Sequence, residues 1–106
     1  MIKKIFISGP MTGIEKYNFP KFDKTEKLLS RYYGYKVVNP AKIARKYKVK
    51  DVLEHREVFD KMVNEELDAL RKCTAIYLLK GWEKSDGVKR ELAMALALNL
   101  EIILEK

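Results

Sequence analysis

The sequence predicts an α/β protein: a small doubly wound parallel sheet of about four strands with helices on both faces, as in flavodoxin-like and Rossmann-like folds. Short apolar runs alternate with helical patterns along all 106 residues. These runs are continuous, which is typical of parallel strands buried on both faces. The first run ends in a Gly-Pro turn between hydroxyl residues, Ser8-Gly9-Pro10-Met11-Thr12, as a strand does where its loop approaches a ligand.

The first half of the chain contains two predicted strands around one helix. The first strand runs from Ile2 to Ser8, and the loop over residues 9–18 is long enough to indicate a functional role. A helix begins near Pro20, because proline suits the first helical turn, and it ends at Gly34, because glycine readily adopts the left-handed conformation. The second strand follows at residues 35–38.

The second half repeats the alternation of helix and strand. Residues 41–56 are lysine-rich and ambiguous, and they fit a partly helical segment that could close over a site as a flap. The remaining predicted elements are a helix over residues 57–72, a strand over 75–79, a helix over 88–98 and a strand over 100–104. Three strand–helix–strand crossovers therefore build the parallel sheet, and we expect one domain spanning residues 1–106.

Composition excludes several classes of site and location. A single cysteine, Cys73, rules out an internal disulfide and a cysteine zinc cluster, and a single histidine, His55, disfavours a histidine-based metal site. We therefore expect neither a metal nor a cofactor. No apolar run approaches the ~20 residues of a membrane span, and the chain enters its first strand directly, without a signal peptide. These features predict a cytoplasmic protein without a membrane partner.

The charge balance predicts an anionic ligand. Lysine and arginine total 22 against 15 acidic residues, a net charge of +7, which fits a nucleotide, a phosphate or a nucleic acid. The basic residues are densest over residues 42–50, where they alternate with apolar ones. We favour a solvated face for this stretch, because the sequence contains no recognisable nucleic-acid-binding motif. We therefore do not expect nucleic acid as a partner.

Two glycine-containing loops are expected to converge on one crevice, because the carboxyl ends of parallel strands meet at one edge of the sheet. The loop over residues 80–87 leads into a helix whose N-terminus offers N–H groups to an anion, although Ser85 alone is more simply a helix cap. Trp82 is either a wall for a flat base or a lid on the core. The expected substrate-binding residues are Ser8, Gly9, Pro10, Met11, Thr12, Gly81, Trp82, Ser85 and Gly87.

Two glutamates are candidates for chemistry. Glu91 falls in the first turn of the last predicted helix, where an acid simply matches the helix dipole, or where the same dipole keeps an attacking carboxylate ionised. Glu66 lies between Val63 and Leu67, either at the edge of the apolar stripe or aimed into the crevice. A second carboxyl near Glu91 would allow acid–base work.

Five stretches together carry a resemblance: Phe6–Gly13, Asn18-Phe19-Pro20, Gly34–Pro40, Tyr77–Trp82 and Ser85–Glu91. They resemble a group of small, mostly phage- or prophage-borne proteins of unassigned function. That group is similar to the nucleoside 2-deoxyribosyltransferases and the allied nucleotide N-glycosidases. The resemblance covers nearly the whole chain.

The resemblance implies a nucleoside 2-deoxyribosyltransferase-like domain that breaks an N-glycosidic bond. In such proteins a glutamate attacks the anomeric carbon, a role that falls on Glu91. Asp86 corresponds to an acid that contacts substrate, and Glu66 stands where an aspartate usually helps to protonate the leaving base. Ser85 and the loop from Ser8 to Thr12 would hold ribose or 5′-phosphate. The sequence departs from the family at Phe6, near the place of a tyrosine that orients the nucleophile.

Two functions stay open at this point. One is a transferase or hydrolase acting on a nucleoside or its 5′-monophosphate; the other is a non-catalytic protein that binds or sequesters a nucleotide. Because a small parallel sheet has two edge strands that need pairing or cover, and because the related enzymes assemble, we expect a homodimer or a higher homo-oligomer.

Overall fold

A four-stranded parallel sheet forms the centre of the protein, in a computed structural model that describes residues 3–106. The strands are β1 (Lys4–Ser8), β2 (Lys36–Val38), β3 (Ala75–Leu78) and β4 (Glu101–Leu104), in the order β2-β1-β3-β4. This confirms the predicted fold class. The predicted start of the first strand, at Ile2, lies outside the described residues.

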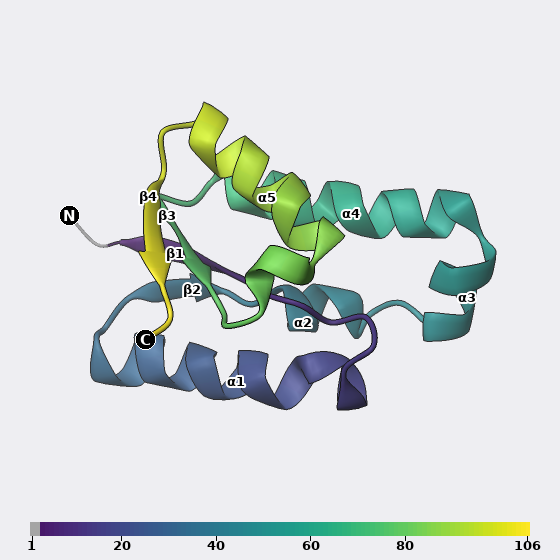
Figure 1. Cartoon of the computed structure of the whole chain (residues 1–106), viewed down its shortest axis with the longest axis horizontal. Coiled ribbons are helices and arrows are strands. Elements are labelled where there is room, and N and C mark those ends of the chain that lie inside the picture. Colours follow the sequence, from purple (N-terminus) through teal and green to yellow (C-terminus); the bar gives the residue numbers. More distant parts are fainter. Residues whose placement is uncertain (1–2) are drawn as a thin grey trace.

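Helices cover both faces of this sheet (Figure 1), with α1 (Phe19–Lys27) on one side and α4 (Arg56–Arg71) and α5 (Asp86–Ala97) on the other. A wide π-helical turn, η2, continues α1, and Gly34 follows it with a positive φ of 71°, as predicted for the end of this helix. The helical elements are η1 (Glu15–Asn18), α1 (Phe19–Lys27), η2 (Leu28–Tyr32), α2 (Pro40–Ala44), α3 (Val49–Glu54), α4 (Arg56–Arg71), η3 (Trp82–Lys84) and α5 (Asp86–Ala97).

The apolar run of β1 is continuous because both of its faces are buried. Ile5 and Ile7 pack in the core under α1, and Phe6 packs in the second core, under α4 and α5. Since side chains alternate along a strand, Ser8 points to the same side as Phe6. The strand thereby directs a hydroxyl group toward α5.

The ambiguous segment 41–56 forms the two short helices α2 and α3. Asn39 begins α2: its Oδ1 accepts a hydrogen bond from the Ala41 N–H, at 2.9 Å. Much of the basic stretch is engaged within the protein, because three of its side chains form ion pairs with carboxylates of α1 and α4. These pairs are Lys42–Glu26, Arg45–Asp23 and Lys46–Glu65.

Within residues 3–106, none of the helices is long and apolar enough to cross a membrane.

Gly9 is required by close packing between the loops that follow β1 and β3. A Cβ atom at Gly9 would lie 2.7 Å from Cδ1 and 2.8 Å from Cβ of Leu79, distances that side chains do not tolerate. Leu79 is fully buried, and its N–H donates to the Ser8 carbonyl at 2.8 Å. The glycine therefore serves the contact between two loops, a role that the sequence did not reveal.

Gly9→Ala is expected to destabilise the protein by about 1–3 kcal/mol, the usual range for overpacking. The matched control is Gly87→Ala, because a Cβ there would meet its nearest neighbours at 3.7 Å and alanine favours a helix by roughly 0.5–1 kcal/mol. Urea denaturation of both variants measures the difference. Equal stability of the two would show that Leu79 does not restrict position 9.

Candidate active site

A cleft of about 650 Å³ opens at the carboxyl ends of β1 and β3, where the sequence predicts it. Its walls come from the loop after β1, from α4, and from the loop that leads into α5. The lining residues are Gly9, Pro10, Met11, Thr12, Ile14, Phe22, Pro40, Phe59, Met62, Glu66, Lys80, Gly81, Lys84, Ser85, Asp86, Gly87, Arg90 and Glu91.

A buried hydrogen bond fixes the Glu91 side chain at the floor of this cleft. The Ser8 hydroxyl donates to Glu91 Oε1 at 2.6 Å. Ser8 is fully buried and Glu91 is 7% exposed. A short bond to a charged acceptor is among the stronger hydrogen bonds, so the end of β1 sets the direction of this carboxyl group.

Ser8 was predicted to bind substrate, but the structure places it behind Glu91, away from the lining of the cleft. Alternation along β1 turns this side chain under α5 rather than into the loop. Ser8 is thus a positioning residue for Glu91. It supplies a hydroxyl group to the glutamate, while Phe6 lies in the core.

Glu66 lies beside Glu91 in the same cleft. It is 7% exposed, on the buried face of α4 with Val63 and Leu70. The sequence left two positions open for Glu66, the edge of the apolar stripe and the crevice, and the structure shows it in the crevice. Burial raises the pKa of both carboxyl groups, and the charge of Glu91 raises that of Glu66 further, because two like charges in one buried site do not both form readily.

The surroundings of the two carboxyl groups differ. Burial, and then the charge of Glu91, raise the pKa of Glu66 well above its usual value. Burial also raises the pKa of Glu91, but the Ser8 hydroxyl and the Arg90 guanidinium oppose this rise. The environment therefore favours the protonated form of Glu66 more than that of Glu91.

Glu91 lies in the second turn of α5, not in the first turn as predicted. The helix begins earlier, at Asp86, because the Ser85 Oγ caps it by accepting a hydrogen bond from the Val88 N–H at 3.2 Å. The charged form of Glu91 is therefore stabilised by the Ser8 hydrogen bond and by the Arg90 guanidinium, rather than by the helix dipole.

Two other predicted residues lie away from these carboxyl groups. Trp82 does not line the cleft and is half-buried against the second core, so of its two interpretations the structure supports a lid on the core. The turn η3, in which Trp82 lies, directs its ring inward. Asp86 lies at the rim with its side chain 98% exposed. The other predicted glycines and loop residues do line the cleft.

Sequence reasoning missed part of the cleft wall. Phe59 and Met62 precede Glu66 on α4 at helical spacing and so lie on the same face. Once Glu66 is placed in the crevice, this spacing predicts that Phe59 and Met62 line it too. The Arg90 guanidinium lies 5.8 Å from the Phe59 ring centre and closes the gap between α5 and α4. Lys80 and Lys84 add positive charge on the opposite side of the opening.

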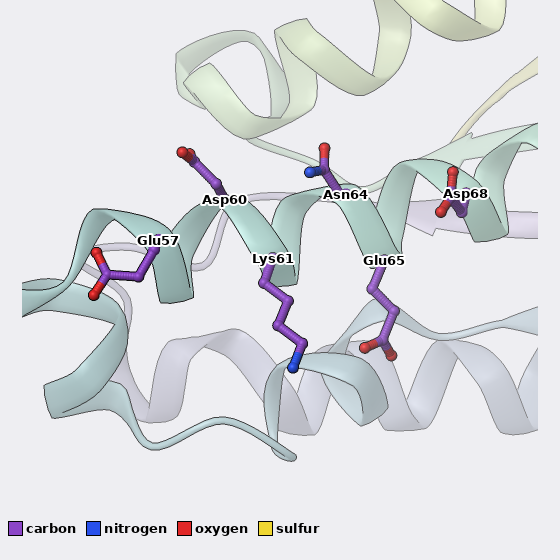
Figure 2. Close-up of a pocket in the computed structure, with 6 residues that line it drawn as sticks. All are labelled: Glu57, Asp60, Lys61, Asn64, Glu65 and Asp68. Atoms are coloured by element: carbon purple, nitrogen blue, oxygen red, sulfur yellow. The ribbon is translucent and has the colours of Figure 1, made fainter.

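A second hollow runs along the exposed side of α4 and differs from the cleft in the arrangement of its side chains. Figure 2 shows that its side chains all come from this one helix and spread in different directions instead of facing one another. Among the described residues, 3–106, no cluster of histidine, cysteine or acidic side chains could hold a metal ion. The hollow is lined by Glu57, Asp60, Lys61, Asn64, Glu65 and Asp68.

Comparisons with known proteins agree with this architecture. Residues 3–104 match the family described as a domain of unknown function (DUF4406), and the chain belongs to that family. No curated protein sequence matches it. Among solved structures, the CMP N-glycosidase BcmB of Clostridium botulinum is similar, with a TM-score of 0.55 and 20% identity over 96% of this chain and 67% of that one. At this identity the likeness is one of fold, and it confirms the resemblance to the N-glycosidase group.

Glu66→Gln is expected to change how stability depends on pH. Below the ordinary pKa of 4.5 both folded and unfolded states hold the Glu66 proton. Above it the unfolded state releases that proton while the folded state retains it, so the free energy of unfolding falls as pH rises. Glutamine removes this loss and should stabilise the protein at neutral pH by about 1–3 kcal/mol.

Thermal denaturation across this pH range measures the effect. The difference in Tm between Glu66→Gln and the unchanged protein should grow from acid to neutral pH, while Glu83→Gln, an exposed control on η3, follows the unchanged protein. Parallel curves for all three proteins would contradict a retained proton on Glu66.

Proposed function

We propose that the protein cleaves, or transfers at, the N-glycosidic bond of a nucleoside, deoxynucleoside or its 5′-monophosphate. The observation that carries this proposal is the pair of buried carboxyl groups, Glu91 and Glu66, that line one cleft, with Glu91 held by the Ser8 hydroxyl. Such a pair supplies a nucleophile and an acid side by side. The likeness in fold to a CMP N-glycosidase supports the same class of substrate.

The first half-reaction uses both carboxyl groups. A carboxylate oxygen of Glu91 attacks the anomeric carbon, and the bond from that carbon to the base nitrogen breaks, with its electron pair going to the base. Glu66 donates its proton to the leaving base. The products are a free base, an ionised Glu66 and a sugar esterified to Glu91.

The second half-reaction restores the enzyme. Water, or the nitrogen of a second base, attacks the anomeric carbon and displaces the Glu91 carboxylate, while Glu66 takes the proton of the attacking group. Water completes a hydrolysis and a base completes a transfer. Ser8 holds the Glu91 carboxylate in one orientation through both steps, which favours a near-attack geometry.

The walls of the cleft fit the two ends of a nucleotide. Phe59 and Met62 offer an apolar surface for a flat base. Lys80, Lys84 and Arg90 surround the opening with positive charge, which suits a 5′-phosphate. Asp86 at the rim stays a proposed contact to substrate.

Glu91→Gln is expected to abolish base release, with turnover falling by roughly three orders of magnitude or more. Glu66→Gln should lower it by about 10²–10⁴-fold, the contribution of a general acid. The assay incubates pure protein with deoxynucleosides, ribonucleosides and their 5′-monophosphates, and detects free base by chromatography. Glu83→Gln, exposed and outside the cleft, is the matched control.

The same assay decides between catalysis and binding alone. Base release that survives in Glu91→Gln would exclude this residue as the nucleophile. If no substrate releases base, but a nucleotide raises the Tm of the protein, the cleft is the binding site of a non-catalytic nucleotide-binding protein. In that case Glu91→Gln leaves the affinity intact, or raises it for a phosphate by removing a negative charge.

Ser8→Ala is expected to move the pH profile of turnover. The Ser8 hydroxyl stabilises the Glu91 carboxylate, so its removal raises the pKa of Glu91 and displaces the acid limb of the profile to higher pH. Turnover on that limb should fall by about tenfold for every pH unit that the limb is displaced. Rates measured across pH for Ser8→Ala and Ser8→Thr test this, since threonine keeps the hydroxyl; an unchanged acid limb in Ser8→Ala would refute the role of Ser8.

A further inference from the structure

The outer edge of β4 presents free backbone groups. The ladder to β3 uses alternate residues of β4: the N–H of Glu101 donates to the Thr74 carbonyl at 3.1 Å, and the N–H of Glu105 donates to the Leu78 carbonyl at 2.9 Å. Because bonding residues alternate in a parallel ladder, the N–H and C=O groups of Ile102 and Leu104 point away from β3. Figure 1 shows β4 at the margin of the sheet.

An apolar surface adjoins this edge. Ile102 and Leu104 are in register with Ile76 and Leu78, which are buried in the core under α5. The core surface thus continues onto β4, where Leu104 is 55% exposed and Ile102 is 37% exposed.

Helix α5 extends the same surface. Arg90 faces α4 through its contact with Phe59, so the opposite flank of α5, which carries Leu92 and Leu96, lies on the side of β4. Leu96 is 60% exposed. In the part of the chain that the structure describes, no segment covers this surface.

The carboxylates beside this edge are offset by lysines. The two carboxylates that flank it are each paired with a lysine of the same chain: Lys3 Nζ lies 2.8 Å from Glu101, and Lys21 pairs with Glu105. Natural edge strands are usually protected from pairing by charges, proline or bulges. The β4 sequence Glu-Ile-Ile-Leu has no proline and no lysine.

We propose that this surface binds a second copy of the chain, with the two β4 strands antiparallel about a two-fold axis at Ile103. In this register Ile102 faces Leu104 of the other copy, and both residues have outward-pointing backbone groups, so they form a hydrogen-bonded pair. Glu101 faces Glu105 of the other copy, and the lysine paired with each carboxylate offsets the repulsion between them. Side chains that face each other across a ladder lie on the same side of the sheet. The exposed apolar surfaces on the two α5 helices therefore meet.

Self-complementarity is what favours this occupant. A two-fold interface brings the same patch of both copies together, and here one register matches the backbone groups and the apolar faces at once. The two sheets become one sheet of eight strands, twice the four of one chain. The proposed dimer does not depend on the activity of the cleft.

Sedimentation of the full chain over a dilution series tests the proposal. We expect a reversible dimer, and we expect Leu104→Lys and Ile102→Pro each to convert it to a monomer. The proline removes an N–H that the β3 ladder does not use. Leu53→Lys, which places the same charge on an exposed leucine of α3, is the matched control and should remain dimeric.

A cysteine cross-link tests the register. At a two-fold axis, position 103 faces itself across a non-hydrogen-bonded pair with Cα atoms about 4.5 Å apart, within the range of a disulfide. Ile103→Cys should therefore form a disulfide-linked dimer on mild oxidation. Leu104→Cys should not, because position 104 faces position 102 of the other copy.

Each result has a definite meaning. A monomer at every concentration, or a dimer that both edge variants leave intact while circular dichroism shows that they are folded, would overturn the proposal. The register would be overturned if Leu104→Lys dissociated the dimer, but the disulfide formed in Leu104→Cys and not in Ile103→Cys.

Discussion

The hydrogen bond between Ser8 and Glu91 is the contact on which the architecture of the site depends. It forms only if β1 ends where it does, if the side chains of β1 alternate as they do, and if α5 lies over the end of that strand. A carboxyl group taken out of water is costly unless it is hydrogen-bonded. Burial and the charge of Glu91 raise the pKa of the second carboxyl group, Glu66, and so favour its protonated form. The fold thus buries most of two acidic groups while leaving both of them on the wall of the cleft.

The two faces of the sheet therefore have different roles. The face covered by α1 is a simple apolar core, with Ile5 and Ile7 against Phe22. The face covered by α4 and α5 combines a core near the amino ends of the strands with the polar site near their carboxyl ends. A parallel sheet allows this division because every strand ends at the same side, so loops far apart in the chain meet there.

The sequence predicted the fold well because its signals were local. Continuous apolar runs, Pro20 and Gly34 marked strands and helix ends, and the structure has them there. The site was harder to predict, since distances across the fold decide it. Spacing alone did not show that Ser8 lies behind Glu91, or that Trp82 turns inward. The position of Glu66 in the crevice, by contrast, was one of two alternatives that its place beside the apolar stripe had already raised.

The missing side chain at Gly9 has a consequence for how such a site can change. Where Leu79 meets bare backbone, the loops after β1 and β3 pack directly against each other, so any side chain at position 9 would displace Leu79. The α4 wall is free of this contact, and Phe59 and Met62 line the cleft from it. A change of specificity therefore disturbs the packing between the two loops less when it falls on α4 than when it falls at Gly9.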